Sequence, residues 1–178
     1  IAVMPGLLAK RAEIKSSTAK FDFRILKKHY GILLTIFFIT ISYAAIVSFL
    51  PLHAVNIGVQ NPGLLFTILG LTQIIFGPIM GRLSDRIGRI KIIVFSIALL
   101  AASLYLLSAF ASNQLLAFFV FIYALGFSGI YASLPAHLID KTGKSEIGTT
   151  TGFYYGFFDF GIAAGSISLG IIALNYSL

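Results

Sequence analysis

Long apolar runs alternate with short polar segments along the 178 residues of the chain. Five such runs lie near residues 30–52, 63–81, 92–111, 115–137 and 149–175. Each is about 19 to 27 residues long, and about 20 helical residues suffice to cross the apolar core of a bilayer. The strands of a membrane barrel are shorter and alternate in polarity. The pattern therefore predicts an all-α membrane protein with five transmembrane helices.

The composition agrees with a membrane protein and excludes several other classes. Hydrophobic residues make up 58% of the chain and charged residues 11%, whereas a soluble domain carries about 25% charged residues. The absence of cysteine excludes disulfides, thiolate metal sites and a cysteine nucleophile. His53 and His137 fall on opposite sides of the predicted membrane, so they cannot share a metal ion. The sequence also lacks a hydrolytic triad and a phosphate loop, so we expect neither an enzyme nor a bound cofactor or metal.

The basic residues all sort to one side of the predicted membrane. The formal net charge is +7, from 13 Lys and Arg against 6 Asp and Glu. The basic residues precede the first run or lie in the loops after the second and fourth runs: Lys10, Arg11, Lys15, Lys20, Arg24, Lys27, Lys28, Arg82, Arg86, Arg89, Lys91, Lys141 and Lys144. Because Lys and Arg are enriched in cytoplasmic loops, we expect this side, and the N-terminus of the chain, to be cytoplasmic. Because the membrane topology accounts for all the basic residues, the positive charge does not indicate a nucleic-acid-binding protein.

The ends of the chain indicate an excerpt of a larger protein. Residues 1–29 form the expected cytoplasmic linker, and the apolar residues 1–8 within it fit the tail of a preceding helix. Residues 30–178 form the expected transmembrane bundle, truncated before its last helix. The aromatic residues Phe21 and Phe23 lie among basic residues, which suits either contact with an anionic membrane surface or a solvated linker.

The segment between the second and third runs has the chemistry of a conformational latch. It reads Gly81-Arg82-Leu83-Ser84-Asp85-Arg86-Ile87-Gly88-Arg89. Gly81 allows two helices to approach closely, and Gly88 allows a tight turn. Asp85 can pair with an arginine, and Arg86 and Arg89 can bind carboxylates or lipid phosphates. Such ionic contacts can hold one conformation of a transporter and break in another.

This segment resembles the signature loop of the major facilitator superfamily, Gly-x-Leu-Ala-Asp-Arg-x-Gly-Arg-Lys/Arg. It differs in having Ser84 for the usual Ala and Ile90 for the usual basic residue. The resemblance implies a partial six-helix bundle of the major facilitator fold. Residues 49–88 resemble helices seven and eight of bacterial drug-efflux members, so residues 30–175 would be helices seven to eleven. Gly77 stands before Pro78 where related sequences often carry an Arg.

The competing assignment is the first half of such a transporter, helices one to five. The signature occurs after the second helix of either half, so the motif alone allows both. The fifth helix of antiporter first halves usually carries a Gly-Pro pair, and the fifth run here has Gly165-Ser166 instead. The basic linker before the first run also resembles the connection between halves. Both observations favour the second half.

Asp159 is the one charged residue well inside an apolar run. It lies ten residues beyond Thr149, or about 15 Å at ~1.5 Å per residue, near the middle of a core about 30 Å thick. An ionised carboxylate there costs about 2.5–3.5 kcal/mol on insertion scales. Two interpretations follow: a site for a coupling proton or a substrate cation, or a protonated acid in a structural hydrogen bond.

Small residues on either side of Asp159 share its helical face. The stripe is spaced by three and four and contains Gly152, Gly156, Ala163, Ser166 and Gly170. Because small stripes mark helix contacts in membranes, we expect Asp159 to face other helices or a cavity. Weaker candidates for a cavity lining are Tyr43, Gln73 and Tyr123, each of which can equally serve packing.

The resemblance implies a fragment of a secondary active transporter. The first hypothesis is proton-coupled efflux of small amphipathic compounds by alternating access, in a plasma membrane such as the bacterial inner membrane. Its partners would be a small-molecule substrate, protons, membrane lipid and the missing N-terminal half. The alternatives are a nutrient or metabolite symporter or uniporter of the same fold, and a non-transporting membrane sensor or assembly module.

Overall fold

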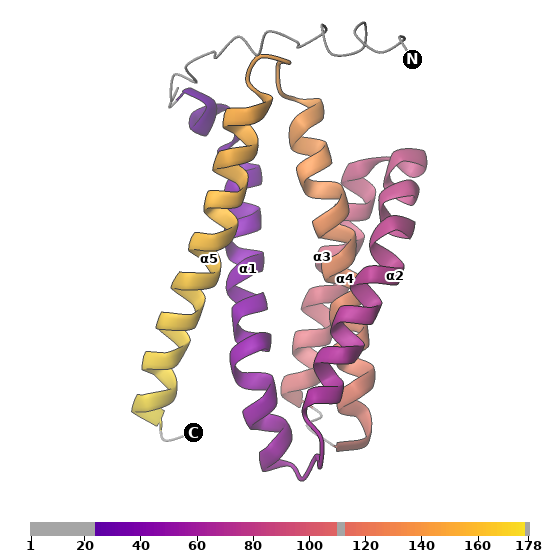
Figure 1. Cartoon of the computed structure of the whole chain (residues 1–178), viewed down its shortest axis with the longest axis vertical. Helices are drawn as coiled ribbons and strands as arrows, with labels where there is room; N and C mark the ends of the chain where they lie inside the picture. The colour runs from indigo at the N-terminus through magenta and orange to yellow at the C-terminus, as the bar shows by residue number, and fades with distance from the viewer. Residues whose placement is uncertain (1–23, 110–112, 177–178) are drawn as a thin grey trace, which may run out of the picture.

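The computed structural model describes residues 24–109 and 113–176. Within these residues the regular secondary structure consists of helices. The helices are α1 (Arg24–Asn56), α2 (Gly63–Ile87), α3 (Arg89–Ala109), α4 (Asn113–Asp140) and α5 (Ile147–Tyr176). Figure 1 shows that they run up and down alternately, so α1, α3 and α5 share one direction and α2 and α4 the other. The predicted all-α membrane fold is confirmed.

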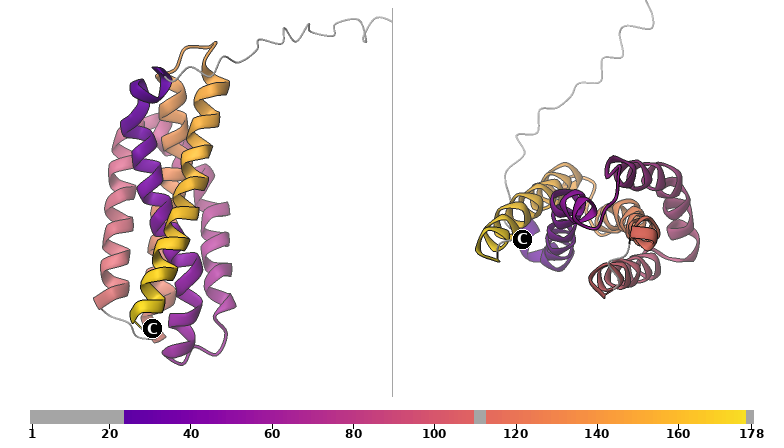
Figure 2. Two further views of the ribbon diagram at one scale, coloured as in Figure 1. Left: turned by 90° about the vertical axis from the view of Figure 1, so that its left-hand side faces the viewer. Right: turned by 90° about the horizontal axis from the view of Figure 1, so that it is seen from below.

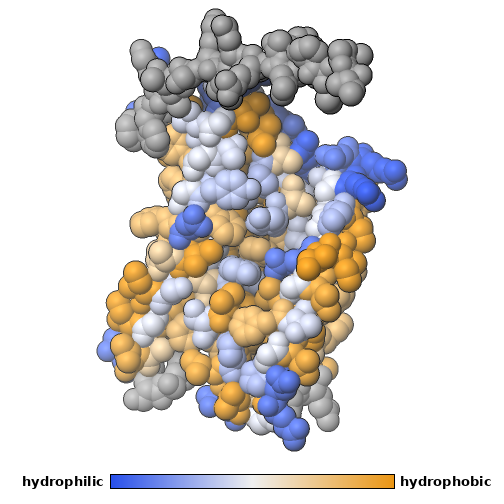
Figure 3. All heavy atoms as spheres, viewed as in Figure 1, coloured by the Kyte–Doolittle hydropathy of each residue, from blue (hydrophilic) through white to orange (hydrophobic). Residues whose placement is uncertain are grey.

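All five helices have the length and composition of membrane spans. Each contains an 18-residue stretch with a mean hydropathy of at least 1.8 and is at least 21 residues long. Large apolar side chains also lie on the outer surface, among them Leu174, Ile74 and Tyr105, which are 85%, 72% and 69% exposed. Figure 3 shows hydrophobic residues along the length of this face, with the largest group of strongly hydrophilic residues at the upper right and smaller ones at the lower end and left side. This is the surface of a multi-pass membrane protein.

The helices extend beyond the predicted apolar runs at the polar ends. α1 begins at Arg24, inside the segment expected to be a linker, and α2 continues from Gly81 to Ile87. Only Gly88, with φ of +106°, separates α2 from α3. The segment expected to be a loop is therefore helical except at Gly88. Hydropathy marks where the bilayer ends, whereas the helix continues as long as its backbone hydrogen bonds do. Residues 1–23 lie outside the described part of the chain.

α4 is the central helix of the bundle. It packs along α2 and α3, while α1 packs along α5, and α1 meets α4 over a smaller area. The view from below in Figure 2 shows the α1–α5 pair beside the group of α2, α3 and α4. Val120, Tyr123, Ala124 and Ile130 of α4 are fully buried. The core thus lies around α4, and the outer faces of the other helices remain exposed.

Close helix contacts occur where a glycine faces a neighbouring backbone. A Cβ at Gly161 would lie 2.6 Å from the Phe37 carbonyl oxygen, and one at Gly165 would lie 2.9 Å from Ala44 Cβ, so α5 approaches α1 closely at both points. A Cβ at Gly126 of α4 would lie 2.9 Å from the Ser96 carbonyl oxygen of α3. These contacts leave no room for a side chain.

The stripe predicted as the contact face of α5 is not the face that packs here. Gly152, Gly156 and Gly170 have open space where a Cβ would lie, and Asp159 is exposed among the described residues. The helix carries a second set of small residues, Gly161 and Gly165, on the opposite face, and this set meets α1. Spacing alone cannot choose between two small faces on one helix, so whether the stripe of Asp159 faces a cavity or another helix stays a prediction.

Gly161→Ala tests this packing. The added methyl must displace the backbone of α1 at Phe37, and overpacking of this kind costs about 1–3 kcal/mol. We expect a clear fall in the thermal unfolding temperature of the full-length protein in detergent, followed by size-exclusion fluorescence.

Gly152→Ala is the matched control on the same helix, since no described atom lies near its Cβ position. It should leave the unfolding temperature unchanged or slightly higher, because alanine favours helix over glycine. An unfolding temperature for Gly161→Ala equal to that of the wild type would contradict the observed α1–α5 contact.

Candidate functional site

One end of the bundle collects the basic residues of the described chain. The start of α1, the α2–α3 junction and the α4–α5 turn lie together at the top of Figure 1, because successive helices alternate in direction. These segments carry Arg24, Lys27, Lys28, Arg82, Arg86, Arg89, Lys91, Lys141 and Lys144. We call this the basic end.

Arg89 is the centre of an ionic contact at the basic end. Its Nε lies 2.6 Å from Oδ2 of Asp140, and its Nη2 lies 3.4 Å from Oδ1 of Asp85. The first contact joins the start of α3 to the end of α4, and the second spans the α2–α3 junction. The predicted pairing of Asp85 with a nearby arginine is thus present, and Arg89 is the partner.

The backbone around Gly88 brings these charges together. The Gly88 N–H donates to the Ser84 carbonyl at 3.1 Å and ends α2. The positive φ of Gly88, which suits a residue without a Cβ, turns the chain so that α3 starts at the next residue. Asp85 and Arg89 therefore remain one turn apart across the junction. Gly81 lies beside α4, where a Cβ would be 3.7 Å from that of Ala132.

Asp140 was not predicted as a functional residue. Only 24% of the Arg89 side chain is exposed, so the acid that meets it neutralises a partly buried charge. A signal was available, because Asp140 follows the fourth run by three residues, at the same side of the membrane as the signature segment. Arg86 is exposed, and the structure shows no ion pair for it within the described residues. A second ionic contact joins Lys28 of α1 to Glu146 before α5 at 3.6 Å.

A row of aromatic rings runs from α1 across α4 to α5. Tyr43 stacks on Phe127 with ring centroids 4.5 Å apart, and Phe127 lies 6.3 Å from Tyr131. Tyr131 then meets Phe158 of α5 at 6.3 Å, and Phe158 meets Tyr155 at 6.4 Å. We call these five residues the aromatic row. Tyr131 and Tyr155 are 50% and 44% exposed, so the row presents open ring surface.

Only one member of the aromatic row, Tyr43, was among the predicted cavity residues. Tyr123, another of them, is fully buried beside the row, where its hydroxyl and that of Ser42 are 3.0 Å apart. Tyr123, Phe127 and Tyr131 are spaced by four, which places them on one face of a helix. This spacing was the sequence signal for the α4 members. The partners on α1 and α5 depend on tertiary packing.

Asp159 lies near the middle of α5, about 18 Å along the axis from Ile147 at ~1.5 Å per residue. It is exposed among the described residues and faces away from the side that packs on α1. Tyr155 precedes it by four residues, so the two side chains leave the helix at neighbouring positions. The aromatic row therefore ends one helical turn from this carboxylate.

Gln73 is not joined to the aromatic row by any described contact. It lies on α2, half-buried, and its amide nitrogen has no hydrogen-bond partner among the described residues. A buried amide without a partner is costly, so Gln73 stays a candidate for contact with a ligand or another helix. Among the described residues, no group of three or more His, Asp and Glu side chains could hold a metal ion.

A comparison with family models assigns the fold. Residues 32–178 match the model of the Major Facilitator Superfamily, which covers all five helices except the first turns of α1. The chain belongs to the major facilitator superfamily. This confirms the resemblance drawn from the signature segment, and the ionic contact of Arg89 is therefore a feature of a transporter fold.

Two curated relatives of this major facilitator chain are tetracycline resistance proteins. The class H protein of Pasteurella multocida is 36% identical over 112 residues, which are 62% of this chain and 27% of the relative. The class B protein of Escherichia coli is 35% identical over 107 residues, 59% of this chain and 26% of the relative. The matched part thus spans about a quarter of the relatives' length. No solved structure matches the chain.

The contact of Arg89 with Asp140 should be stronger than its contact with Asp85. The Asp140 distance is shorter by 0.8 Å (3.4 − 2.6 Å), and the Asp140 side chain is less exposed, 53% against 64%. Double-mutant cycles with Arg89→Gln, Asp140→Asn and Asp85→Asn should give a coupling of about 0.5–1 kcal/mol for the Asp140 pair and less for the Asp85 pair.

The measurement is reversible unfolding of the full-length protein in detergent at low and high salt. High salt should reduce both couplings, because all three groups are partly exposed. A larger coupling for Asp85 than for Asp140 would show that the two acids have the opposite order of importance.

Proposed function

We propose that this chain is part of a secondary active transporter that exports small amphipathic compounds in exchange for protons. The observation that carries the proposal is the aromatic row ending one turn from Asp159 in the middle of α5. It combines an apolar, stackable surface with a single acidic group at membrane depth. Such a pairing suits a substrate with a flat apolar body and a polar or cationic group.

The proposed exchange follows from the chemistry of one carboxylate. An ionised carboxylate is costly at the bilayer midplane. Asp159 therefore favours either the protonated form or contact with a cationic group. A carboxylate that binds either of these, but not both at once, makes substrate release dependent on proton uptake. The rings of the row supply van der Waals contact and attract a cation over their faces. Binding and coupling are then adjacent on α5.

The orientation of the chain in the membrane follows from its basic end. We place the basic end in the cytoplasm, since Lys and Arg are retained on that side during insertion. The contacts of Arg89 with Asp85 and Asp140 then lie at the cytoplasmic surface, where they would hold α2, α3 and α4 together as the bundle rocks. We assign the five helices to positions seven to eleven of twelve, with the N-terminal half supplying the opposite wall.

The relatives favour export over uptake. Both are named for resistance to tetracycline, a small compound with fused rings, and resistance is a consequence expected of efflux. Because the chain spans about a quarter of their length, the substrate range of the whole protein is part of the proposal. A symporter of the same fold would accumulate substrate in cells that express it, and a uniporter would bring the substrate to equilibrium across the membrane.

Asp159→Asn tests the coupling. The amide keeps the size of the side chain but cannot take up a proton, so exchange should stop. In everted vesicles with an acidic interior, tetracycline and planar cationic compounds should discharge the proton gradient with the wild type, read by a pH-sensitive dye. We expect at least a tenfold smaller response from Asp159→Asn.

Ser166→Ala is the matched control, since Ser166 shares the exposed stripe of α5 and carries no charge. It should retain the response within twofold. Equal responses of Asp159→Asn and the wild type would remove Asp159 from the coupling path and leave it a structural acid. No response of the wild type to any compound would contradict proton-coupled export.

Tyr131→Ala tests the aromatic row as a substrate surface. Loss of one ring contact, worth about 0.5–1.5 kcal/mol, should raise the half-saturating concentration about two- to tenfold. Tyr131→Phe keeps the ring and should stay within twofold of the wild type. Tyr105→Ala removes a tyrosine that is 69% exposed on α3, outside the row, and serves as control. Equal effects of Tyr131→Ala and Tyr105→Ala would exclude a specific role of the row.

A further inference from the structure

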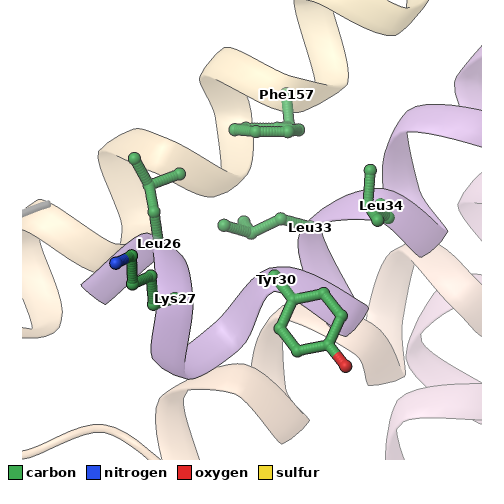
Figure 4. Close-up of a pocket in the computed structure, with 6 residues that line it drawn as sticks. All are labelled: Leu26, Lys27, Tyr30, Leu33, Leu34 and Phe157. Carbon is green, nitrogen blue, oxygen red and sulfur yellow. The ribbon is translucent and has the colours of Figure 1, made fainter. Parts of the chain in front are cut away.

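An apolar groove lies between α1 and α5 at the basic end. It has a volume of about 480 Å³ and is lined by Leu26, Lys27, Tyr30, Leu33, Leu34 and Phe157. Five of these residues come from the first three turns of α1, and Phe157 comes from α5. Figure 4 shows Leu26, Leu33 and Phe157 pointing toward one another, with the Tyr30 hydroxyl directed away from them. We call this the Lys27 groove.

The wall of the groove is almost wholly apolar, because Lys27 and Tyr30 line it with their carbon atoms. Lys27 is the one cationic residue among those that line the groove. Tyr30 and Leu34 are 66% and 43% exposed, so the groove opens to the outer surface of the bundle. A ligand that fits must be mostly apolar, with a negative group at the end that meets Lys27. The volume lies within the range of about 300–1,000 Å³ found for small-molecule sites.

The charges around the mouth are arranged for an anion. Lys27 is flanked in sequence by Lys28, and Arg24 lies one turn earlier on α1. Lys28 already contacts Glu146 at 3.6 Å, whereas Lys27 is exposed and has no acidic partner in the described residues. Phosphate headgroups of the cytoplasmic leaflet lie at the level where basic residues flank transmembrane helices, and anionic lipids bind such clusters.

We propose that the Lys27 groove is a binding site for an anionic phospholipid, with an acyl chain against Leu33, Leu34 and Phe157 and the phosphate at Lys27. The proposal rests on the cytoplasmic orientation of the basic end but not on transport activity. The lipid would touch both α1 and α5, and so would stabilise the pair that carries Asp159 and the α1 and α5 members of the aromatic row.

A second cavity provides an internal comparison. It has a volume of about 550 Å³ and lies at the opposite end, lined mainly by α1 and α3 residues that include Phe49, His53 and Leu107. Its lining contains no Lys or Arg. It therefore lacks the cation that would select a phosphate, and we expect lipid contacts there to be independent of headgroup charge.

The test uses the full-length protein in nanodiscs of phosphatidylcholine that contain a trace of phosphatidylglycerol with a photoreactive group in its acyl chain. Crosslinked peptides are mapped by mass spectrometry. Labelling is expected in the peptides around residues 26–34 and 157. A phosphatidylcholine probe should label the same peptides about fivefold less, the factor for one basic residue near an anionic surface.

The variants separate headgroup from chain recognition. Lys27→Gln should lower phosphatidylglycerol labelling about fivefold to the level of phosphatidylcholine. Leu34→Trp should fill the groove and lower labelling by both probes. Lys144→Gln, which removes an exposed basic residue of the α4–α5 turn, is the control and should leave labelling unchanged.

Three results would overturn the proposal. Equal labelling by both probes would show that the groove does not select an anionic headgroup. Equal labelling of the wild type and Lys27→Gln would remove Lys27 as the phosphate contact. Absence of lipid labelling, together with failure of a Leu34→Cys thiol to react with a membrane-permeant maleimide, would show that another part of the transporter fills the groove. None of these readouts requires substrate or a proton gradient.

Discussion

The contact of α4 with the α1–α5 pair is the interaction on which the bundle depends. α1 and α5 form one closely packed pair, and α2, α3 and α4 form another group, so the two are joined by the smaller contacts of α4 with α1 and with α5. In a membrane, apolar burial between helices gains little over contact with lipid, so polar and shape-specific contacts decide such junctions. Here the Ser42–Tyr123 hydrogen bond and the Tyr43–Phe127 stack provide them. The same contact begins the aromatic row.

The sequence predicted the number of helices, the side on which their basic ends gather, and the turn at Gly88. These features depend on the thickness of the bilayer and on local backbone freedom, both of which are properties of single segments. The helix ends were less predictable, as α2 shows by continuing to Ile87. Beyond the bilayer, hydropathy falls while helical hydrogen bonding continues.

The parts of the candidate site that were missed depend on more than one helix. Asp140 meets Arg89 only because α3 and α4 are adjacent at the basic end. Phe127 and Phe158 gain a role only when α4 lies beside both α1 and α5. The sequence predicts the depth of Asp159 in the membrane but not the side of α5 from which it projects. The reason is that α5 carries small residues on two faces, and α1 packs on the face with Gly161 and Gly165.

The one-residue junction at Gly88 has a mechanical consequence. With α2 ending at Ile87 and α3 starting at Arg89, the connection has no slack, so a tilt of α2 is passed to α3 unless the φ and ψ angles of a single glycine absorb it. α3 is in turn seated on α4 at Gly126. These three helices are therefore tightly linked to one another, whereas α4 meets α1 and α5 over smaller areas, so a tilt of α2 is passed on to α3 and α4 more directly than to the α1–α5 pair.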